Sequence, residues 1–346
     1  MGRGGFRFAA WLALAMFAAM LVVAWIYDLP VRDPDSGAGP TYLRLPAILL
    51  AAFIVDVLPR VVWRARTDPG LRARFREVVR ERWPLGHLRF ALLGLGAWYL
   101  TYHAFRNLKS YVPFVNKHLW DGVFDDIDRF LFFGNDPAAL MHAALGTGVA
   151  AQFFSYIYIA WIAMVPASLA VALVWTRDRR AGSWYVTAVA VDWVLGVATY
   201  FALPTLGPIY ARPELFTDLD RTHVTGLQEM MMEERHQVLV NPFTTDAVQT
   251  IAAFASLHVG ISVTMALMAE LLRLHRWVRA FLWVFLFLTV LSTVYLGWHY
   301  AVDAVGGAAL GTAAVWIAAK GTGNAFRRRA PGDQPALSIS DPSRVA

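Results

Sequence analysis

The chain has 346 residues, a formal net charge of +6 and a hydrophobic content of 58%. This composition is too apolar for a soluble domain, so the sequence predicts an all-α, polytopic membrane helical bundle. The absence of cysteine excludes disulfides, thiolate catalysis and zinc-thiolate sites. The arginines lie mostly in short connections between apolar runs, where membrane topology explains them better than nucleic-acid binding does.

Eight apolar runs predict about eight transmembrane helices. They cover approximately residues 6–27, 43–63, 88–105, 149–175, 184–203, 251–272, 278–298 and 299–319. The first run has no cleavage signature before residue 28 and is expected to be a retained anchor. We expect residues 88–320 to form a six-helix core, preceded in residues 1–87 by two additional helices and a basic loop. Residues 321–346 are expected to be a disordered basic tail.

Three connections between the runs have distinct compositions. Residues 64–83 are basic with one apolar edge, typical either of a helix on the membrane surface or of a solvated loop. Residues 106–144 interleave aromatic and charged residues, as interfacial segments do. Residues 204–250 contain the stretch MMMEERHQ, whose methionines suit an adaptable lid for lipid. We expect its acidic residues and histidine to be solvated, so no metal site is predicted.

The charges of the connections predict an orientation. Arginines are concentrated near the N-terminus, in residues 60–89, 177–180 and 273–279, and in the tail. With eight spans these segments share one side, which the positive-inside rule makes cytoplasmic. His258 and His299 then lie at span ends on the extracytoplasmic side. Two residues that are far apart in the sequence can therefore share one site.

Two histidines and an aspartate form the most informative constellation. Asp303 follows His299 by four residues, and on a helix this interval places both side chains on one face within hydrogen-bonding reach. Histidine can serve as nucleophile, base or acid near neutrality, and a carboxylate can fix its tautomer. A single packed histidine would be the structural alternative. The combination with His258 favours phosphoryl transfer, with one histidine attacking phosphorus and the other protonating the leaving oxygen.

These residues stand in motifs that resemble a known family. SLH at 256–258 and HYAVD at 299–303 resemble the second and third motifs of the type 2 phosphatidic acid phosphatase superfamily. LPTLGPIYARP at 203–213 resembles the Pro-rich loop of its branch containing inositol phosphorylceramide synthases, and the resemblance covers about residues 99–319. It implies that His299 is the nucleophile that forms a phosphohistidine, that Asp303 orients it and that His258 is the general acid. It also implies that no metal or organic cofactor is needed.

The sequence departs from the family pattern in its cations. Arg212-Pro213 has no lysine at the distance of the usual first motif, and Thr293 stands where the third motif has arginine. Other groups must therefore bind the phosphate. For each candidate cation, the alternative is that it reaches lipid headgroups or pairs with the aspartates at 121–128. The candidates on the outer side are the cations Arg106, Lys109, Lys117 and Arg212, together with the hydroxyl groups of Tyr210 and Ser256.

The sequence therefore predicts an integral membrane phosphatase or phosphotransferase that acts on a lipid phosphate. The expected acceptor is water or an alcohol such as inositol or a glycan hydroxyl. The Ala and Arg bias indicates a bacterium, hence the bacterial cytoplasmic membrane, with the site on the extracytoplasmic face. One alternative is a hydrolase of polyprenyl phosphate or phosphatidic acid without transfer activity. A transporter or a lipid-binding protein is the alternative of another class, but no inverted repeat favours transport.

Overall fold

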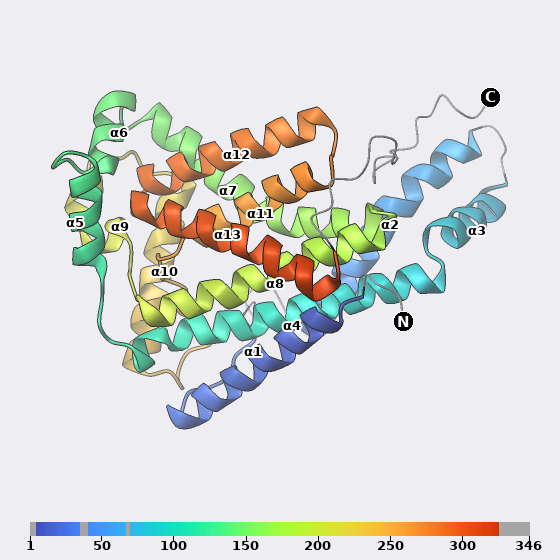
Figure 1. The fold of residues 1–346 in the computed structure, drawn as a ribbon, viewed down its shortest axis with the longest axis horizontal. Helices are drawn as coiled ribbons and strands as arrows, with labels where there is room; N and C mark the ends of the chain where they lie inside the picture. The colour runs from blue at the N-terminus through green and yellow to red at the C-terminus, as the bar shows by residue number, and fades with distance from the viewer. Residues whose placement is uncertain (1–4, 35–40, 67–69, 325–346) are drawn as a thin grey trace.

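The computed structural model describes residues 5–34, 41–66 and 70–324, which form helices and connecting segments without any β-strand (Figure 1). The all-helical prediction is confirmed. The predicted disordered tail lies almost wholly outside the described residues. The α-helices are α1 Arg7–Ile26, α2 Thr41–Ala65, α3 Leu71–Arg82, α4 Leu85–Val115, α5 Asp121–Leu131, α6 Pro137–Leu145, α7 Val149–Ala170, α8 Arg179–Ala202, α9 Pro208–Ala211, α10 His223–Val240, α11 Leu257–Leu271, α12 Arg276–Tyr295 and α13 Ala301–Thr322.

Eight of these helices overlap the eight predicted runs, one helix to each run. Among the described residues, α1, α7 with its π-helical continuation to Trp175, α8, α12 and α13 are long and apolar enough to cross a membrane. The α4 helix has 31 residues and continues well beyond the predicted end of its run. The α11 helix is shorter than predicted because residues 251–256 are not helical, and the N–H of Ala253 donates to Thr205 O at 3.0 Å.

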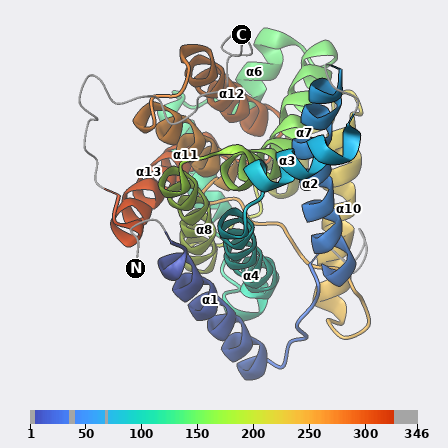
Figure 2. The same ribbon diagram turned by 90° about the vertical axis from the view of Figure 1, so that its right-hand side faces the viewer.

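The centre of the bundle is α8, which contacts α4, α11 and α13 (Figures 1 and 2). Most of its residues are buried, including small and apolar ones on all sides of the helix. A helix that is apolar all round is expected in the interior of a bundle. The α1 helix packs on α4 at the edge, and α7 and α12 complete the bundle on the side of α11.

The α11 and α13 helices approach each other to backbone contact. A Cβ atom at Gly311 would lie 2.2 Å from Gly260 O, and one at Gly307 would lie 2.4 Å from Ser256 O. Small residues four apart commonly allow such close packing between membrane helices. The N-terminal ends of α11 and α13 are therefore held side by side, and the two histidines lie at those ends.

We expect Gly311→Val to destabilise the protein, because its side chain cannot fit against the α11 backbone. Overpacking of this kind costs roughly 2 kcal/mol or more. Thermal unfolding of the purified protein in detergent measures the effect. Gly96→Val is the matched control, because nothing lies within 4 Å of a Cβ at Gly96. Equal melting temperatures for the wild type and Gly311→Val would contradict the observed packing.

The basic segment at 64–83 is held against the neighbouring helix α2. Val78 of α3 is buried with Val57 and Val61 of α2. The buried Asp56 carboxylate accepts hydrogen bonds from Arg82 at 2.7 Å and from the Trp83 indole at 3.0 Å. The C-terminal part of the apolar edge of α3 thus packs on α2, whereas Leu71 and Phe75 are exposed, and α3 lies at the end of the bundle opposite to the histidines (Figure 1).

Candidate active site

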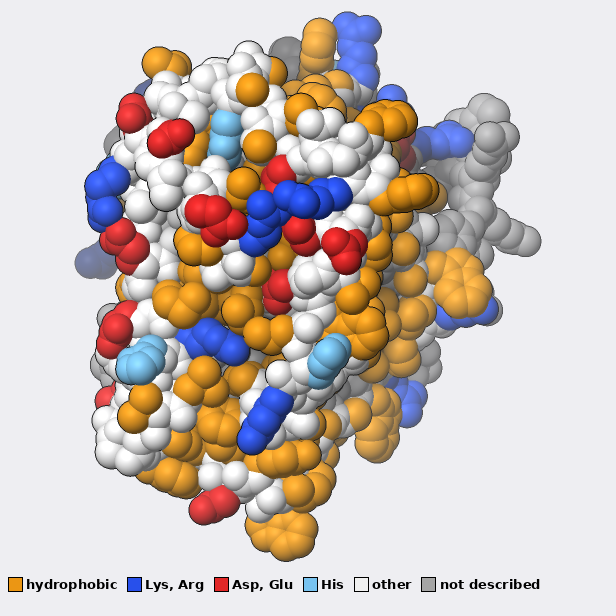
Figure 3. Space-filling model, turned by 90° about the vertical axis from the view of Figure 1, so that its left-hand side faces the viewer, with side chains coloured by type: hydrophobic (Ala, Val, Ile, Leu, Met, Phe, Trp, Pro, Cys, Tyr) orange, Lys and Arg blue, Asp and Glu red, His pale blue; other side chains and the backbone are white. Residues whose placement is uncertain are grey.

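The site lies at the end of the bundle that α5, α6, α9 and α10 cover (Figure 1). Figure 3 looks onto this end. Acidic side chains gather around basic ones in the upper half of that face, whereas its lower half shows more hydrophobic side chains, with isolated basic, acidic and histidine side chains among them. The predicted interfacial segment 106–144 contributes the end of α4 together with α5 and α6.

The two histidines and the aspartate form one hydrogen-bonded chain. His258 Nδ1 lies 3.0 Å from His299 Nε2, and His299 Nδ1 lies 3.1 Å from Asp303 Oδ2. Because a carboxylate only accepts, we assign the proton of His299 to Nδ1 and the lone pair to Nε2. The lone pair accepts the Nδ1–H of His258. Asp303 and His299 are buried, while His258 is partly exposed to the cavity described below.

The contact between His299 and Asp303 has a different origin from the one expected. The spacing was expected to place both residues on one helical face, but α13 begins only at Ala301, after Tyr300 as its N-cap. Asp303 Oδ2 also accepts the backbone N–H of Tyr300 at 3.1 Å. The carboxylate therefore reaches back over the helix start, as in a capping box, and the same oxygen orients the imidazole.

Two aspartates of α5 hold the backbone around this motif. The Asp128 carboxylate accepts the N–H groups of Ala301 and Val302, at 2.6 and 2.9 Å. Asp121 accepts the N–H of Gly207 at 2.9 Å and the hydroxyl of Tyr300 at 3.1 Å. Carboxylates are favourable partners for the free N–H groups at a helix start. From the sequence, these aspartates were considered only as partners for cations, and their contacts with the backbone were missed. Their spacing of seven residues was the available signal, because it places both on one face of a helix.

The stability of wild type relative to Asp128→Asn should fall as the pH rises. Burial raises the pKa of the Asp128 carboxyl from 3.8 to about 6, although its two backbone donors act in the opposite direction. Because the folded pKa lies above the unfolded one, the stabilising contribution is complete below about pH 4 and is lost as the pH rises through about 6. Asparagine does not titrate. Melting temperatures of both proteins from pH 4 to 7 test this, and a pH-independent difference would contradict it.

Aromatic side chains enclose His258. Its ring centroid lies 4.3 Å from that of Trp161 and 5.0 Å from that of Tyr158. Tyr158 stacks on Trp298, the neighbour of His299, with ring centroids 4.9 Å apart. The Trp161 indole donates to the His258 carbonyl at 3.0 Å. The α7 helix thus fixes the first turn of α11 and makes an apolar wall beside the histidine pair.

A cavity of about 550 Å³ begins at the histidine pair and continues between the helices. Its polar lining includes His258, His299, Lys109, Arg106 and Glu234. The rest is mainly apolar and aromatic and includes Trp98, Tyr102, Trp193, Trp161, Leu169 and Leu173 from α4, α7 and α8, and Ile48 from α2. A long apolar cavity with convergent polar groups at one end is typical of a ligand site.

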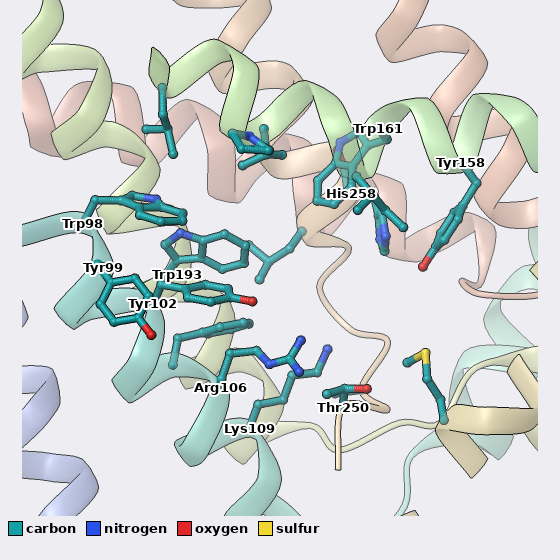
Figure 4. Close-up of a pocket in the computed structure, with 18 of the residues that line it drawn as sticks. Trp98, Tyr99, Tyr102, Arg106, Lys109, Tyr158, Trp161, Trp193, Thr250 and His258 are labelled. Carbon is teal, nitrogen blue, oxygen red and sulfur yellow. The ribbon is translucent and has the colours of Figure 1, made fainter. Parts of the chain in front are cut away.

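Arg106 and Lys109 project from α4 into the space that His258 enters from the opposite side (Figure 4). Lys109 Nζ lies 4.8 Å from the ring centroid of Tyr200. Within the described ranges, no carboxylate lies at ion-pair distance from Lys109. Arg106 donates to the carbonyl of Pro34 at 3.1 Å and still lines the cavity. Both charges can therefore act on an anion beside the histidines.

The other four candidates for phosphate contact lie in different surroundings, and one of them, Lys117, lines only a second cavity described below. Tyr210 lines the cavity, its hydroxyl donates to the Gln228 carbonyl at 3.1 Å, and burial raises its pKa, which keeps the hydroxyl protonated. Ser256 is buried outside the cavity lining and caps α11. Arg212 also lies outside the lining, where it pairs with Asp125 at 3.0 Å and with two further carboxylates. For Arg212 the structure shows the aspartate pairing that the sequence left open.

The methionine-rich helix α10 covers part of the cavity. Met230, Met231 and Glu234 contribute to its lining. Glu229 instead pairs with Arg221 at 2.8 Å on the surface. Within residues 5–34, 41–66 and 70–324, no group of three or more His, Asp or Glu side chains is arranged to hold a metal ion.

The fold and the site define a class of protein: a helical membrane protein with a buried His-His-Asp constellation at one end of an apolar cavity. The sequence model of the PAP2 superfamily matches residues 124–317. The chain belongs to the PAP2 superfamily, whose members are phosphatases or phosphotransferases and act on lipid phosphates at membranes. No curated protein and no solved structure matches the chain. The matched range contains both histidines and Asp303, whereas Arg106 and Lys109 precede it.

Proposed function

We propose that this protein transfers a phosphoryl group or a phospho-headgroup from a lipid donor, through a phosphohistidine at His299, to an alcohol or to water. The observation that carries the proposal is the hydrogen-bonded chain His258–His299–Asp303 at the polar end of an apolar cavity. The lone pair on His299 Nε2 faces the place where the other histidine can deliver a proton. Membership in the PAP2 superfamily supports this chemistry.

In the first step, His299 Nε2 attacks phosphorus and the bond from phosphorus to the leaving oxygen breaks. His258, protonated on both ring nitrogens for this step, gives one proton to that oxygen and becomes neutral, and Asp303 stabilises the positive charge on the phosphorylated imidazole. The direct bond between the two rings must open for phosphorus to reach Nε2. In the second step, His258 takes a proton from water or an alcohol, whose oxygen attacks phosphorus and releases His299.

Lys109 and Arg106 supply positive charge to the transition state. Phosphoryl transfer spreads negative charge over the equatorial oxygens, and fixed cations stabilise it most in a site from which water is largely excluded. The apolar part of the cavity is lined in part by α7 and α8, which are long and apolar enough to cross a membrane, so the hydrocarbon chain of the donor fits there. With the hydrocarbon chain bound there, the phosphate would lie at the polar end, beside both histidines.

The orientation and the acceptor belong to the same proposal. The positive-inside rule supports a site on the extracytoplasmic face of a bacterial cytoplasmic membrane. The Pro-rich loop at 203–213 supports the inositol phosphorylceramide synthase branch, hence transfer to an alcohol such as inositol or a glycan hydroxyl. Hydrolysis of polyprenyl phosphate or phosphatidic acid without transfer is the alternative outcome within the family.

The deciding experiment measures phosphate release and headgroup transfer by the purified protein with a panel of lipid phosphates, in the presence of EDTA. Wild type is compared with His258→Ala, for which we expect a loss of about 10²–10⁴ in kcat. Addition of inositol or another alcohol then separates transfer from hydrolysis. Turnover that persists unchanged in His258→Ala would overturn the two-histidine mechanism.

A further inference from the structure

A second cavity of about 260 Å³ adjoins the first at the same end of the molecule. The two cavities share the lining residues Leu206, Ile251 and Ala252. The second cavity is formed by the end of α4, the loop at 204–206, the segment at 249–252 and α10. A ligand bound there would lie next to the catalytic cavity without filling it.

The polar lining of this cavity comprises two cations, the amide of Gln249, and Asn116 and Thr205, which already hydrogen-bond to Phe201 and Phe254. Arg235 and Lys117 line it, and no carboxylate does. Neither cation lies within ion-pair distance of a carboxylate in the part of the chain that the structure describes. Asp121 is the acidic group that acts on Arg235, but its oxygens are occupied by the N–H groups of Leu206 and Gly207. Burial lowers the pKa of the Arg235 guanidinium.

A buried amide provides an independent sign of a missing ligand. Gln249 lines the cavity and is fully buried, and its Nε2 has no hydrogen-bond partner among the described residues. Its Oε1 accepts the N–H of Ile251, which leaves the amide nitrogen as the free end. A buried N–H donor without a partner is rare, because it has lost water without gaining another acceptor. A guanidinium, an ammonium and an amide N–H are all donors of the kind that bind phosphate oxygens, and all three residues line this one cavity.

We propose that this cavity, lined by Arg235, Lys117 and Gln249, binds the phosphate of a second ligand, a small polyol phosphate or the headgroup of a neighbouring anionic lipid. The boundary shared with the catalytic cavity places the remainder of such a ligand toward the histidine pair. Its role as the acceptor that presents a hydroxyl to phospho-His299 rests on the proposed function above. Binding of the anion in this cavity does not depend on the proposed function.

The test is direct binding of glycerol 1-phosphate to the full-length protein in phosphatidylcholine nanodiscs, in the His299→Ala background to exclude turnover. We expect binding of glycerol 1-phosphate and none of glycerol. Arg235→Gln in this background should weaken binding about tenfold or more. The matched control is Arg221→Gln, an exposed arginine of the same connection that already pairs with Glu229. If Arg235→Gln does not fold, Lys117→Gln replaces it, because Lys117 is exposed.

Nanodiscs that contain phosphatidylglycerol identify the source of the anion. Competition with glycerol 1-phosphate indicates a lipid headgroup in the cavity, and its absence indicates a water-soluble ligand. Equal affinity of the Arg235→Gln and Arg221→Gln proteins, or no binding to the parent protein, would overturn the proposal. Because this test measures no turnover, the absence of anion binding would leave the two-histidine mechanism intact. Conversely, anion binding by a protein whose wild type shows no turnover would leave the cavity assignment intact.

Discussion

His299→Ala should abolish turnover of every lipid phosphate that the wild type uses, with a loss of at least about 10⁴ in kcat. The reason is that alanine removes the nitrogen atom to which the phosphoryl group is transferred. His258 can still give a proton, but no nucleophile attacks phosphorus. Steady-state kinetics measures the loss. Rapid quench with a phosphorus-labelled donor should show a labelled wild-type protein, stable in alkali and labile in acid as a phosphoramidate is, and no label on the variant.

The matched control for this substitution is His223→Ala, at an exposed histidine of α10 at the same end of the molecule. This variant should retain wild-type kinetics. Label that remains on the His299→Ala protein would show that another residue accepts the phosphoryl group. Turnover without any labelled intermediate in wild type would instead favour direct attack by water or alcohol.

Lys109→Gln should lower kcat/KM by about 10²–10³, the usual loss when one preorganised charge donor is removed from a site of this kind. Lys109 lies among aromatic side chains, with Nζ 4.8 Å from the Tyr200 ring centroid, and faces the cavity beside the histidines. Its charge has no carboxylate partner in the described ranges, so a phosphate would be its counter-ion. Kinetics with one lipid phosphate at several concentrations gives kcat/KM.

The control is Lys320→Gln, because Lys320 also lies over an aromatic ring, that of Trp316, but at the other end of α13. We expect no kinetic change from it. Lys109→Arg should recover part of the activity, since it restores the charge with a different geometry. A Lys109→Gln protein with wild-type kcat/KM would show that this lysine does not contact the phosphate.

The sequence predicted the helices well because long apolar runs carry a strong signal. The α7, α12 and α13 helices lie close to the expected limits. The run at 251–272 was predicted poorly, since residues 251–256 are not helical and the N–H groups of Ala253 and Phe254 donate to Thr205. A buried non-helical segment can have the same composition as a buried helix, so hydropathy alone does not separate them.

The candidate site was predictable only where its residues are neighbours in the chain. His299 and Asp303 were paired from their spacing, although the cap of α13 and not a helical face brings them together. Cations were harder to place. Lys109 lines the cavity, while Arg212 is held by Asp125, and both were equal candidates because they lie on the same predicted side.

The sequence by itself determined the class of the fold, the two histidine motifs and the side of the membrane on which they were expected to meet. Tertiary structure alone decided which charges lie beside the histidines, that α5 supports the start of α13, and that a second cavity with an unpaired amide adjoins the first. The physical reason is the distance along the chain over which each kind of interaction acts. Hydropathy and capping act within a few residues, whereas the partner of a buried charge is set by contacts between helices far apart in the chain.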